Sequence, residues 1–275
     1  MIKEKPIGIL TYEKFHNLPK NSIGSSRIRM SWLLPYWSSA EEYVEDKNYK
    51  TIIFQKVYWD EIENFKCIKI FDFVDPFIKI TNLDNLKTVH AITVPTESLI
   101  NYLKPIFPTK KIVCIPDRMN INEAKPIKEI HNEKFKKLIW FGYSENAYCL
   151  FDYLEEIKRR NIELTVISET IIDFKGYRVN QIQFEYEQLN SEIINHDAVF
   201  LPHAIDKFTK YKSNNKTIHS WSLKMPVIVN LEDFEKFESK NARQVEGEIR
   251  RKEVEEKWNI KESVKQYKEL IRSLH

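Results

Sequence analysis

The sequence predicts an α/β protein with two doubly wound, Rossmann-like domains, and three observations support this prediction. Short apolar segments rich in β-branched residues recur along the 275-residue chain and are apolar on both faces, as is typical of parallel strands covered by helices. Longer amphipathic segments alternate with them. The apolar segments also fall into two groups, separated by a polar, proline-containing stretch at 117–135.

Ten segments are predicted as strands and six as helices. The first group of strands is PIGIL (6–10), KTIIFQKV (50–57), CIKIFDFV (67–74), AITVP (91–95) and KIVCIP (111–116). The second group is KLIWFG (137–142), IELTVIS (162–168), QIQFE (181–185), AVFLP (198–202) and VIVN (227–230). The helices are expected at 25–38, 97–106, 147–160, 186–196, 215–224 and from about 232 onward.

We expect an N-terminal domain over 1–125, a second domain over 126–255 and a C-terminal helix over 256–275. One continuous ten-stranded sheet is the alternative. The last helix should pack on another part of the protein, because four apolar side chains share one of its faces: Val264, Tyr267, Ile271 and Leu274.

Composition excludes several classes of protein. The net charge of +3 is too small to argue for a nucleic-acid partner, and the tryptophans lie in core-like patterns instead of alternating with basic residues. The three cysteines are widely spaced and fit no metal motif, which favours a reducing cytosol. No apolar run approaches the length of a membrane span or a signal peptide, so a cytoplasmic location is expected.

Glycine is scarce, with only five in the chain. Neither G-x-G-x-x-G nor the P-loop pattern occurs, which argues against a dinucleotide oxidoreductase and a P-loop enzyme. A phosphate must therefore be held mainly by side chains and helix ends.

The lysine-rich run KYKSNNK (210–216) is the strongest candidate for such a site. Ser213, Asn214 or Asn215 can cap a helix that begins near Lys216. The free N–H groups and the positive end of the helix dipole would then point toward the same place as Lys212 and Lys216. Two lysines suit a diphosphate, and the preceding strand AVFLP predicts a position at the carboxyl edge of a sheet. A solvated loop with lysines for solubility is the alternative.

Two more loops have the character of ligand loops. In GSSRIR (24–29), Gly24 permits a tight turn, Ser25 or Ser26 can cap, and Arg27 and Arg29 lie in a first turn where the dipole disfavours cations. Either an anion binds there or the arginines pair with surface glutamates.

The loop WFGYSEN (140–146) runs from a strand through Gly142 and Ser144 into a helix, as ligand-facing loops of Rossmann domains do.

In their order these segments resemble a GT-B glycosyltransferase of the retaining, E-x7-E type. The resemblance covers nearly the whole chain, through IGSSRIR, FDFVDP, AITVPTESLINYL, VCIPD, WFGYSEN and LPHAIDKFTKYKSNNKTIHSWSLKMPVIV. The last segment is the most specific part of the resemblance, because the motif of the family at this place ends E-A-x-A-x-G-x-P-V. The resemblance implies two Rossmann-like domains facing a cleft, a sugar nucleotide on the second domain, an acceptor on the first, and a C-terminal helix that returns to the first.

The chain departs from this motif at its glutamates. Counted back from Pro226, His219 and Tyr211 stand at the two glutamate positions, and Lys224-Met225 replaces the usual glycine. Some sugar transferases carry a K-S-N-N-K run instead, and this chain is most similar to those. His219 then either substitutes as a ribose contact or is a satisfied buried histidine.

The resemblance also implies roles for individual residues. Lys212, Lys216 and the amides near Asn214 and Asn215 would stabilise the leaving diphosphate without a metal, and Arg27 would close over the phosphates. Asp72 and Asp75 would orient or deprotonate an acceptor hydroxyl, the alternatives being the start of a turn and, less favoured, a metal pair. Glu185 and Tyr186 would line the base, although ordinary helix-start chemistry explains Glu185 equally well.

The function implied is transfer of a sugar from a nucleotide-diphosphate sugar to a glycan, lipid-linked or other glycoconjugate acceptor. No tightly bound cofactor and no nucleic-acid partner are expected, and peripheral association with the inner face of a membrane fits such an acceptor. The alternative is a non-catalytic nucleotide or sugar-nucleotide binding protein on the same scaffold.

Overall fold

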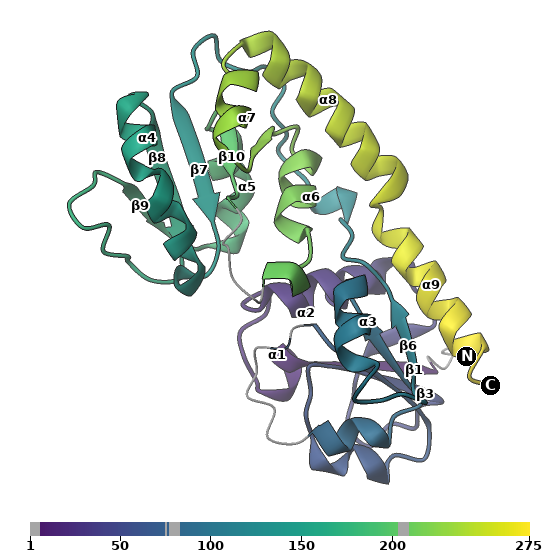
Figure 1. Ribbon diagram of the computed structural model, residues 1–275. Helices are drawn as coiled ribbons and strands as arrows, with labels where there is room; N and C mark the ends of the chain where they lie inside the picture. Colours follow the sequence, from purple (N-terminus) through teal and green to yellow (C-terminus); the bar gives the residue numbers. More distant parts are fainter. Residues whose placement is uncertain (1–5, 75, 77–82, 203–208) are drawn as a thin grey trace. The chain divides into compact units, whose positions relative to one another are not determined.

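The computed structural model describes residues 6–74, 76, 83–202 and 209–275, which form two compact units (Figure 1). The first unit consists of Met1–Asn120, Lys210–Ser213 and Asn259–His275. The second consists of Ile121–Thr209 and Asn214–Trp258. Within the described ranges, no helix combines the length and the apolar character needed to cross a bilayer.

The first unit contains a parallel sheet of six strands in the order β2-β1-β3-β4-β5-β6. The strands are β1 (Ile7–Thr11), β2 (Ala40–Glu42), β3 (Thr51–Gln55), β4 (Ile68–Asp72), β5 (Ala91–Val94) and β6 (Lys111–Cys114). All five segments predicted as strands in this half are confirmed. Strand β2 was missed because it is only three residues long and contains two glutamates.

Short helical segments surround this sheet. They are α1 (Tyr12–Phe15), α2 (Gly24–Arg29), the 3-10 helices η1 (Ser31–Tyr36), η2 (Asp60–Asn64) and η3 (Leu83–Lys87), α3 (Glu97–Leu103) and α9 (Ile260–Arg272). The single helix predicted over 25–38 is divided at Met30, and its second part is a 3-10 helix that contains Pro35. Proline lacks the N–H that an α-helix interior requires, which accounts for the change.

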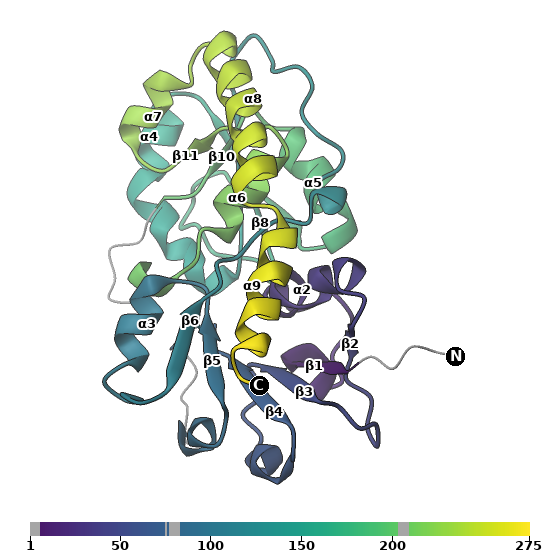
Figure 2. The same ribbon diagram turned by 90° about the vertical axis from the view of Figure 1, so that its right-hand side faces the viewer.

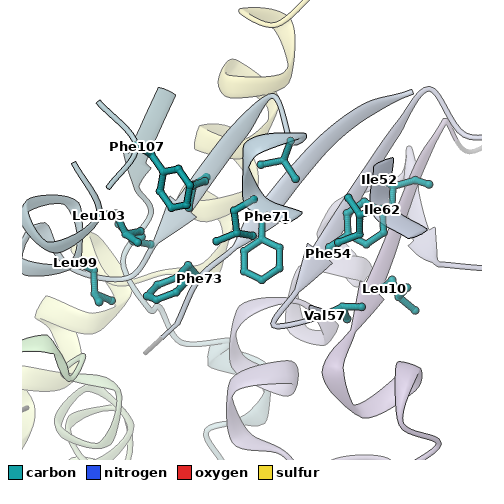
Figure 3. Close-up of a cluster of buried hydrophobic side chains, with 14 of the residues drawn as sticks. Leu10, Ile52, Phe54, Val57, Ile62, Phe71, Phe73, Leu99, Leu103 and Phe107 are labelled. Carbon is teal, nitrogen blue, oxygen red and sulfur yellow. The ribbon is translucent and has the colours of Figure 1, made fainter. Parts of the chain in front are cut away.

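An apolar cluster fills one face of the first sheet (Figure 3). Leu10, Phe54 and Phe71 come from three adjacent strands and are at most 4% exposed. Helix α3 contributes Leu99 and Leu103 to the same cluster, and both are fully buried. Since side chains alternate along a strand, the residues between these point to the opposite face.

Helix α9 covers that opposite face, although it is the last helix of the chain (Figure 2). Its Tyr267 is 1% exposed, and the ring lies 5.8 Å from the Trp37 ring centroid to centroid. Val264 and Ile271 are also buried, as the apolar face predicted, while Leu274 is half-buried. The final 17 residues, Asn259–His275, thus complete the core of a unit whose sheet ends more than a hundred residues earlier.

Arg29 lies at the centre of a buried polar network beneath α9. Its Nε and Nη2 donate to the Asp72 carboxylate at 2.7 and 2.6 Å, and its Nη1 donates to Asp117 Oδ1 at 2.7 Å. Tyr267 and Thr93 donate their hydroxyls to Asp72 at 3.1 and 2.7 Å. Charged groups tolerate burial only when paired and hydrogen-bonded in this way.

The network also decides the ionisation of Arg29. Burial acts to lower the pKa of its guanidinium, but the charge of Asp72 and, after it, Tyr267 and Asp117 outweigh burial and hold the pKa well above its ordinary value. Arg29 therefore stays charged in the folded protein.

We predict that Arg29→Met lowers the free energy of unfolding by about 3–5 kcal/mol, because it leaves two buried carboxylates without their cation. Denaturant titration of the full chain measures the change. Arg159→Met is the matched control: this arginine pairs with Glu156 at the surface with its side chain 69% exposed, so its loss should change stability little. Equal effects of the two substitutions would contradict the central role of Arg29.

The second unit contains a parallel sheet of five strands in the order β11-β10-β7-β8-β9. They are β7 (Lys137–Phe141), β8 (Glu163–Ser168), β9 (Asn180–Gln183), β10 (Ala198–Phe200) and β11 (Val227–Ile228), at all five predicted segments. The helical segments are η4 (Ile121–Glu123), η5 (Ser144–Tyr153), α4 (Leu154–Arg159), α5 (Tyr186–Ile194), α6 (Asn215–Ser222), α7 (Leu231–Lys236) and α8 (Lys240–Lys257), and η6 (Thr209–Tyr211) leads back into the first unit.

The α/β prediction is therefore confirmed, and the alternative of one ten-stranded sheet is wrong. In each sheet the strand order reverses direction once. The reversal lies between β1 and β3 in the first sheet and between β7 and β10 in the second. Ligands of open α/β sheets bind beyond the carboxyl ends of the strands at such a reversal.

Gly247 lets α8 pack closely in the second unit. A Cβ at this position would lie 2.3 Å from the carbonyl oxygen of Lys224, just after α6. Any other residue would push the two helices apart, so this glycine serves packing and not a ligand.

The polar stretch predicted as a linker, 117–135, is packed where it enters the second unit. Lys128 Nζ donates to the carbonyls of Ile194 and His196 at 2.7 and 3.1 Å. His131 is 1% exposed, and its Nε2 lies 3.1 Å from the carbonyl oxygen of Lys224. The polar side chains of the 117–135 stretch therefore make buried hydrogen bonds and do not serve solvation alone.

His131 makes stability sensitive to acid. Burial lowers the pKa of its imidazole to about 4, below the value near 6.5 of an exposed histidine. The unfolded chain therefore takes up this proton first as the pH falls, and the contribution of neutral His131 is lost progressively from about pH 6.5 toward pH 4. His131→Gln should flatten the dependence of unfolding free energy on pH in that window, which denaturant titrations at several pH values measure. Parallel curves for wild type and variant would contradict this assignment.

Candidate functional site

The carboxyl end of β7 and the first turn of α6 meet in the second unit. The Lys216 ammonium lies 4.8 Å from the centroid of the Trp140 ring and 6.0 Å from that of Phe141. A cation over an indole face is stabilised by the ring quadrupole. The structure therefore brings together the lysine run and the WFGYSEN loop, which the sequence singled out independently.

Gly142 makes this arrangement possible. A Cβ on this residue would lie 2.3 Å from Lys216 Nζ and 3.1 Å from the Trp140 ring. The absent side chain leaves the space in which the ammonium lies. Lys216 is thus held at the strand end where the second sheet reverses its order, the position expected of a ligand contact.

The start of α6 is electrostatically suited to an anion. The helix spans eight residues from Asn215, and its first turn contains no acidic residue. The backbone N–H groups of this turn and the positive end of the dipole favour negative charge, while Lys216 in the same turn adds a full positive charge. Asn214 is the N-cap but its side chain makes no capping hydrogen bond, contrary to the sequence prediction.

His219 is buried and connects α6 to α5. Asn190 donates its amide to the carbonyls of Glu123 and Lys125 at 2.7 and 2.9 Å, so its Oδ1 is left as the acceptor. His219 Nε2 lies 2.7 Å from this oxygen and must be the donor. These contacts support the second of the two sequence interpretations, a satisfied buried histidine. Sequence reasoning missed Asn190, since nothing near it marks a site.

Ser144 is engaged by a carboxylate that the sequence did not single out. Its backbone N–H and hydroxyl donate to Glu169 at 2.9 and 2.6 Å. Burial acts to raise the pKa of Glu169, but the hydrogen bonds from Ser144 outweigh it and hold that pKa below its ordinary value. A phosphate that used the Ser144 donors would have to displace Glu169.

Glu185 and Tyr186 begin α5, at the end of the edge strand β9. Glu185 is the N-cap residue and is exposed, and its side chain accepts a hydrogen bond from Gln188. The Tyr186 hydroxyl donates to Glu123 Oε2 at 3.0 Å. The contacts of Glu185 are those of ordinary helix-start chemistry.

The lysine run is divided between the two units. Lys212 and Ser213 belong to the first unit, and Asn214 and the rest of the run belong to the second. Ser213 Oγ donates to Asp117 Oδ2 at 2.5 Å and so does not cap α6, which corrects the prediction. Lys212 is exposed.

The GSSRIR loop differs most from its prediction. Gly24 is the first residue of α2 and not part of a tight turn, and neither Ser25 nor Ser26 caps the helix. Ser26 Oγ instead donates to Gln55 Oε1 at 2.9 Å, within the first unit. For Arg29 both predicted interpretations are wrong. Its guanidinium pairs with the buried carboxylates of Asp72 and Asp117, and it binds neither a surface glutamate nor an external anion.

Asp72 does not have the environment of a catalytic carboxylate. It is fully buried and accepts hydrogen bonds from Arg29, Thr93 and Tyr267. An acceptor hydroxyl could reach it only by breaking this network, so the predicted role for Asp72 is replaced by a structural one. Asp75, predicted beside it, lies outside the described residues.

Comparison with known proteins identifies the fold. No protein-family model and no curated protein matches the sequence. Among solved structures, that of TarM superposes with a TM-score of 0.63 at 11% identity and covers 87% of this chain. This chain in turn spans only 57% of TarM.

Anabaena HepE in complex with UDP gives a TM-score of 0.62 at 8% identity, over 97% of this chain and 99% of HepE. Its complex with UDP and glucose gives 0.63 at 9% identity over the same shares. The fold is GT-B. It consists of two α/β units, each with its own parallel sheet, as the resemblance implied.

We predict that Arg27→Ala lowers the melting temperature of the free protein. An arginine that only contacted a ligand would leave this temperature nearly unchanged when replaced. Arg27 is 6% exposed and donates from Nη1 to the Asn21 carbonyl at 2.7 Å. Loss of a charge-assisted hydrogen bond costs about 1.5–3 kcal/mol, or roughly 3–10 °C for a unit of this size. Lys20→Ala, at an exposed neighbouring position, is the control. An unchanged melting temperature for Arg27→Ala would contradict this structural role and would favour the original prediction that Arg27 contacts a ligand.

Proposed function

We propose that this chain is a glycosyltransferase that uses a nucleotide-diphosphate sugar as donor and a glycan or glycoconjugate as acceptor. One observation carries the proposal: Lys216, in the first turn of α6, lies beside Gly142 at the carboxyl end of β7, where the second sheet reverses its order. The same fold in HepE was solved with UDP and with UDP and glucose.

The chemistry of sugar transfer explains why a cation belongs there. As the bond to the anomeric carbon breaks, negative charge develops on the leaving diphosphate. A fixed ammonium and the backbone N–H groups at the start of α6 stabilise that charge without reorganising at the moment of reaction. Lys212, four residues earlier in the chain, is proposed to add a second positive charge. We further propose that the transfer is retaining and independent of metal, as the resemblance implies.

The proposal assigns the remaining residues by what they contact. Gly142 gives Lys216 its space, and His219 positions α6 through Asn190 instead of binding ribose. Ser144 and Tyr186 remain proposed nucleotide contacts, and the acceptor is proposed to be a glycan or a lipid-linked glycoconjugate at the inner face of a membrane. Asp72 has no part in the reaction.

We predict that Lys216→Ala weakens UDP binding roughly tenfold to a hundredfold, because a charge-assisted hydrogen bond is worth about 1.5–3 kcal/mol. Uridine has no phosphate to lose contact with, so its affinity should not change. A thermal-shift screen of nucleoside diphosphates first establishes which base to use, and calorimetry on wild type and variant measures both ligands.

Lys158→Ala is the matched control, since Lys158 also lies over an aromatic ring of this unit, 6.0 Å from the centroid of Tyr177, but on α4. It should bind UDP as wild type does. If wild-type protein binds nucleoside and nucleoside diphosphate equally well, the diphosphate site is wrong. If it binds the diphosphate but neither hydrolyses nor transfers from any donor of a sugar-nucleotide panel, the non-catalytic alternative replaces the transferase.

A further inference from the structure

A second positively charged site lies in the first unit, on the outer side of α9. A groove of about 480 Å³ runs along this helix, and it is lined by Tyr36, Val264, the acidic Glu269 and four cationic side chains. The cations are Lys261, Lys265, Lys268 and Arg272, and we call them the α9 row. All four side chains belong to the first unit, whereas Lys216 belongs to the second.

The spacing of the α9 row is regular. Its members are four, three and four residues apart, so they share one face of the helix and extend over about 16 Å of its axis. Lys261 at one end also lies 5.5 Å from the centroid of the Tyr36 ring. Arg272 at the other end lies in the last turn, where the helix dipole favours cations. The row thus presents a line of positive charge along a concave surface.

The α9 row lacks the short ion pairs that the arginines of the preceding helix form. In α8, side-chain ion pairs link Arg250 to Glu246 at 2.8 Å and Arg251 to Glu255 at 2.6 Å. In α9, Lys265 pairs with Glu262 at 3.9 Å, and over the described residues neither Lys268 nor Arg272 takes part in an ion pair. A chain with a net charge of only +3 therefore places four cations and a single carboxylate, that of Glu269, in the lining of one groove, which leaves an excess of positive charge there.

The shape of the groove and its side chains indicate the ligand. A bilayer surface would call for apolar side chains that protrude, but Val264 in the groove is 4% exposed and the Tyr36 hydroxyl donates to Asn120. Single-stranded nucleic acid would call for several stacking rings, and Tyr36 is the aromatic side chain of the lining. A concave line of cations instead matches a linear chain that carries repeated anionic groups.

We propose that the α9 row binds an anionic glycan, with phosphate or carboxylate groups along its length. This deepens the proposed function, on which it rests for the choice of a glycan: the acceptor would be an anionic polysaccharide that binds to the first unit through the α9 row.

The test is direct binding to defined probes. Lys265→Ala/Arg272→Ala removes two exposed charges of the row, and Lys252→Ala/Lys257→Ala removes two exposed charges from α8 as the matched control. A carboxylate oligomer (oligogalacturonate), a phosphate oligomer (polyphosphate) and a neutral malto-oligosaccharide of similar length are titrated at low and high salt. The row variant should bind one or both anionic oligomers about tenfold more weakly than wild type, the control should bind as wild type, and the neutral oligomer should not bind.

Two further measurements separate the possible failures. UDP titration of the row variant should match wild type, so loss of the glycan site and loss of the nucleotide site are distinguishable. Vesicles with about 30 mol% phosphatidylglycerol and a DNA oligonucleotide serve as the competing polyanions. The proposal is overturned if the row and control variants lose equal affinity for the anionic oligomers, or if wild type prefers vesicles or DNA to both of them.

Discussion

The first unit depends on a single buried guanidinium. Arg29 joins the end of β4 through Asp72 to the segment after β6 through Asp117, and through Asp72 it reaches Tyr267 of α9. These groups cannot be buried separately, because each would then lack its counter-charge or its hydrogen-bond partner. The arrangement of helix α2, the sheet and the C-terminal helix is therefore fixed by one connected set of polar contacts beside an apolar core.

The same network extends to the lysine run. Asp117 accepts from Arg29 on one oxygen and from Ser213 on the other, so the start of the run is fixed to the first unit. From Asn214 onward the run belongs to the second unit and becomes the first turn of α6. Ser213, the residue before the N-cap of α6, is thus held by a hydrogen bond, and groups fixed in advance are what the proposed diphosphate site needs.

The two sites proposed for the chain use positive charge differently. Lys216 is a single ammonium held by Trp140 and by the space at Gly142, a geometry suited to one compact diphosphate. The α9 row is a line of cations along one helix face, an arrangement suited to an extended chain of anions. Scarcity of glycine is consistent with this division, since neither site relies on a glycine-rich loop.

By itself the sequence determined the α/β class and ten of the strands, because these features follow from local periodicity. It also singled out the KSNNK and WFGYSEN segments as candidates for a site, from helix-start chemistry and strand ends. Tertiary structure alone decided what the charged and polar side chains do. The arginines of GSSRIR and the carboxylate of Asp72 have the composition of a ligand site, yet they neutralise or hydrogen-bond groups inside the first unit. The hydrogen-bond partner of His219 is likewise distant in the sequence, since it is Asn190, 29 residues away. The physical reason is that a charge has the same appearance in a sequence whether its partner is a ligand or a distant residue, and only folding brings that partner within hydrogen-bond distance.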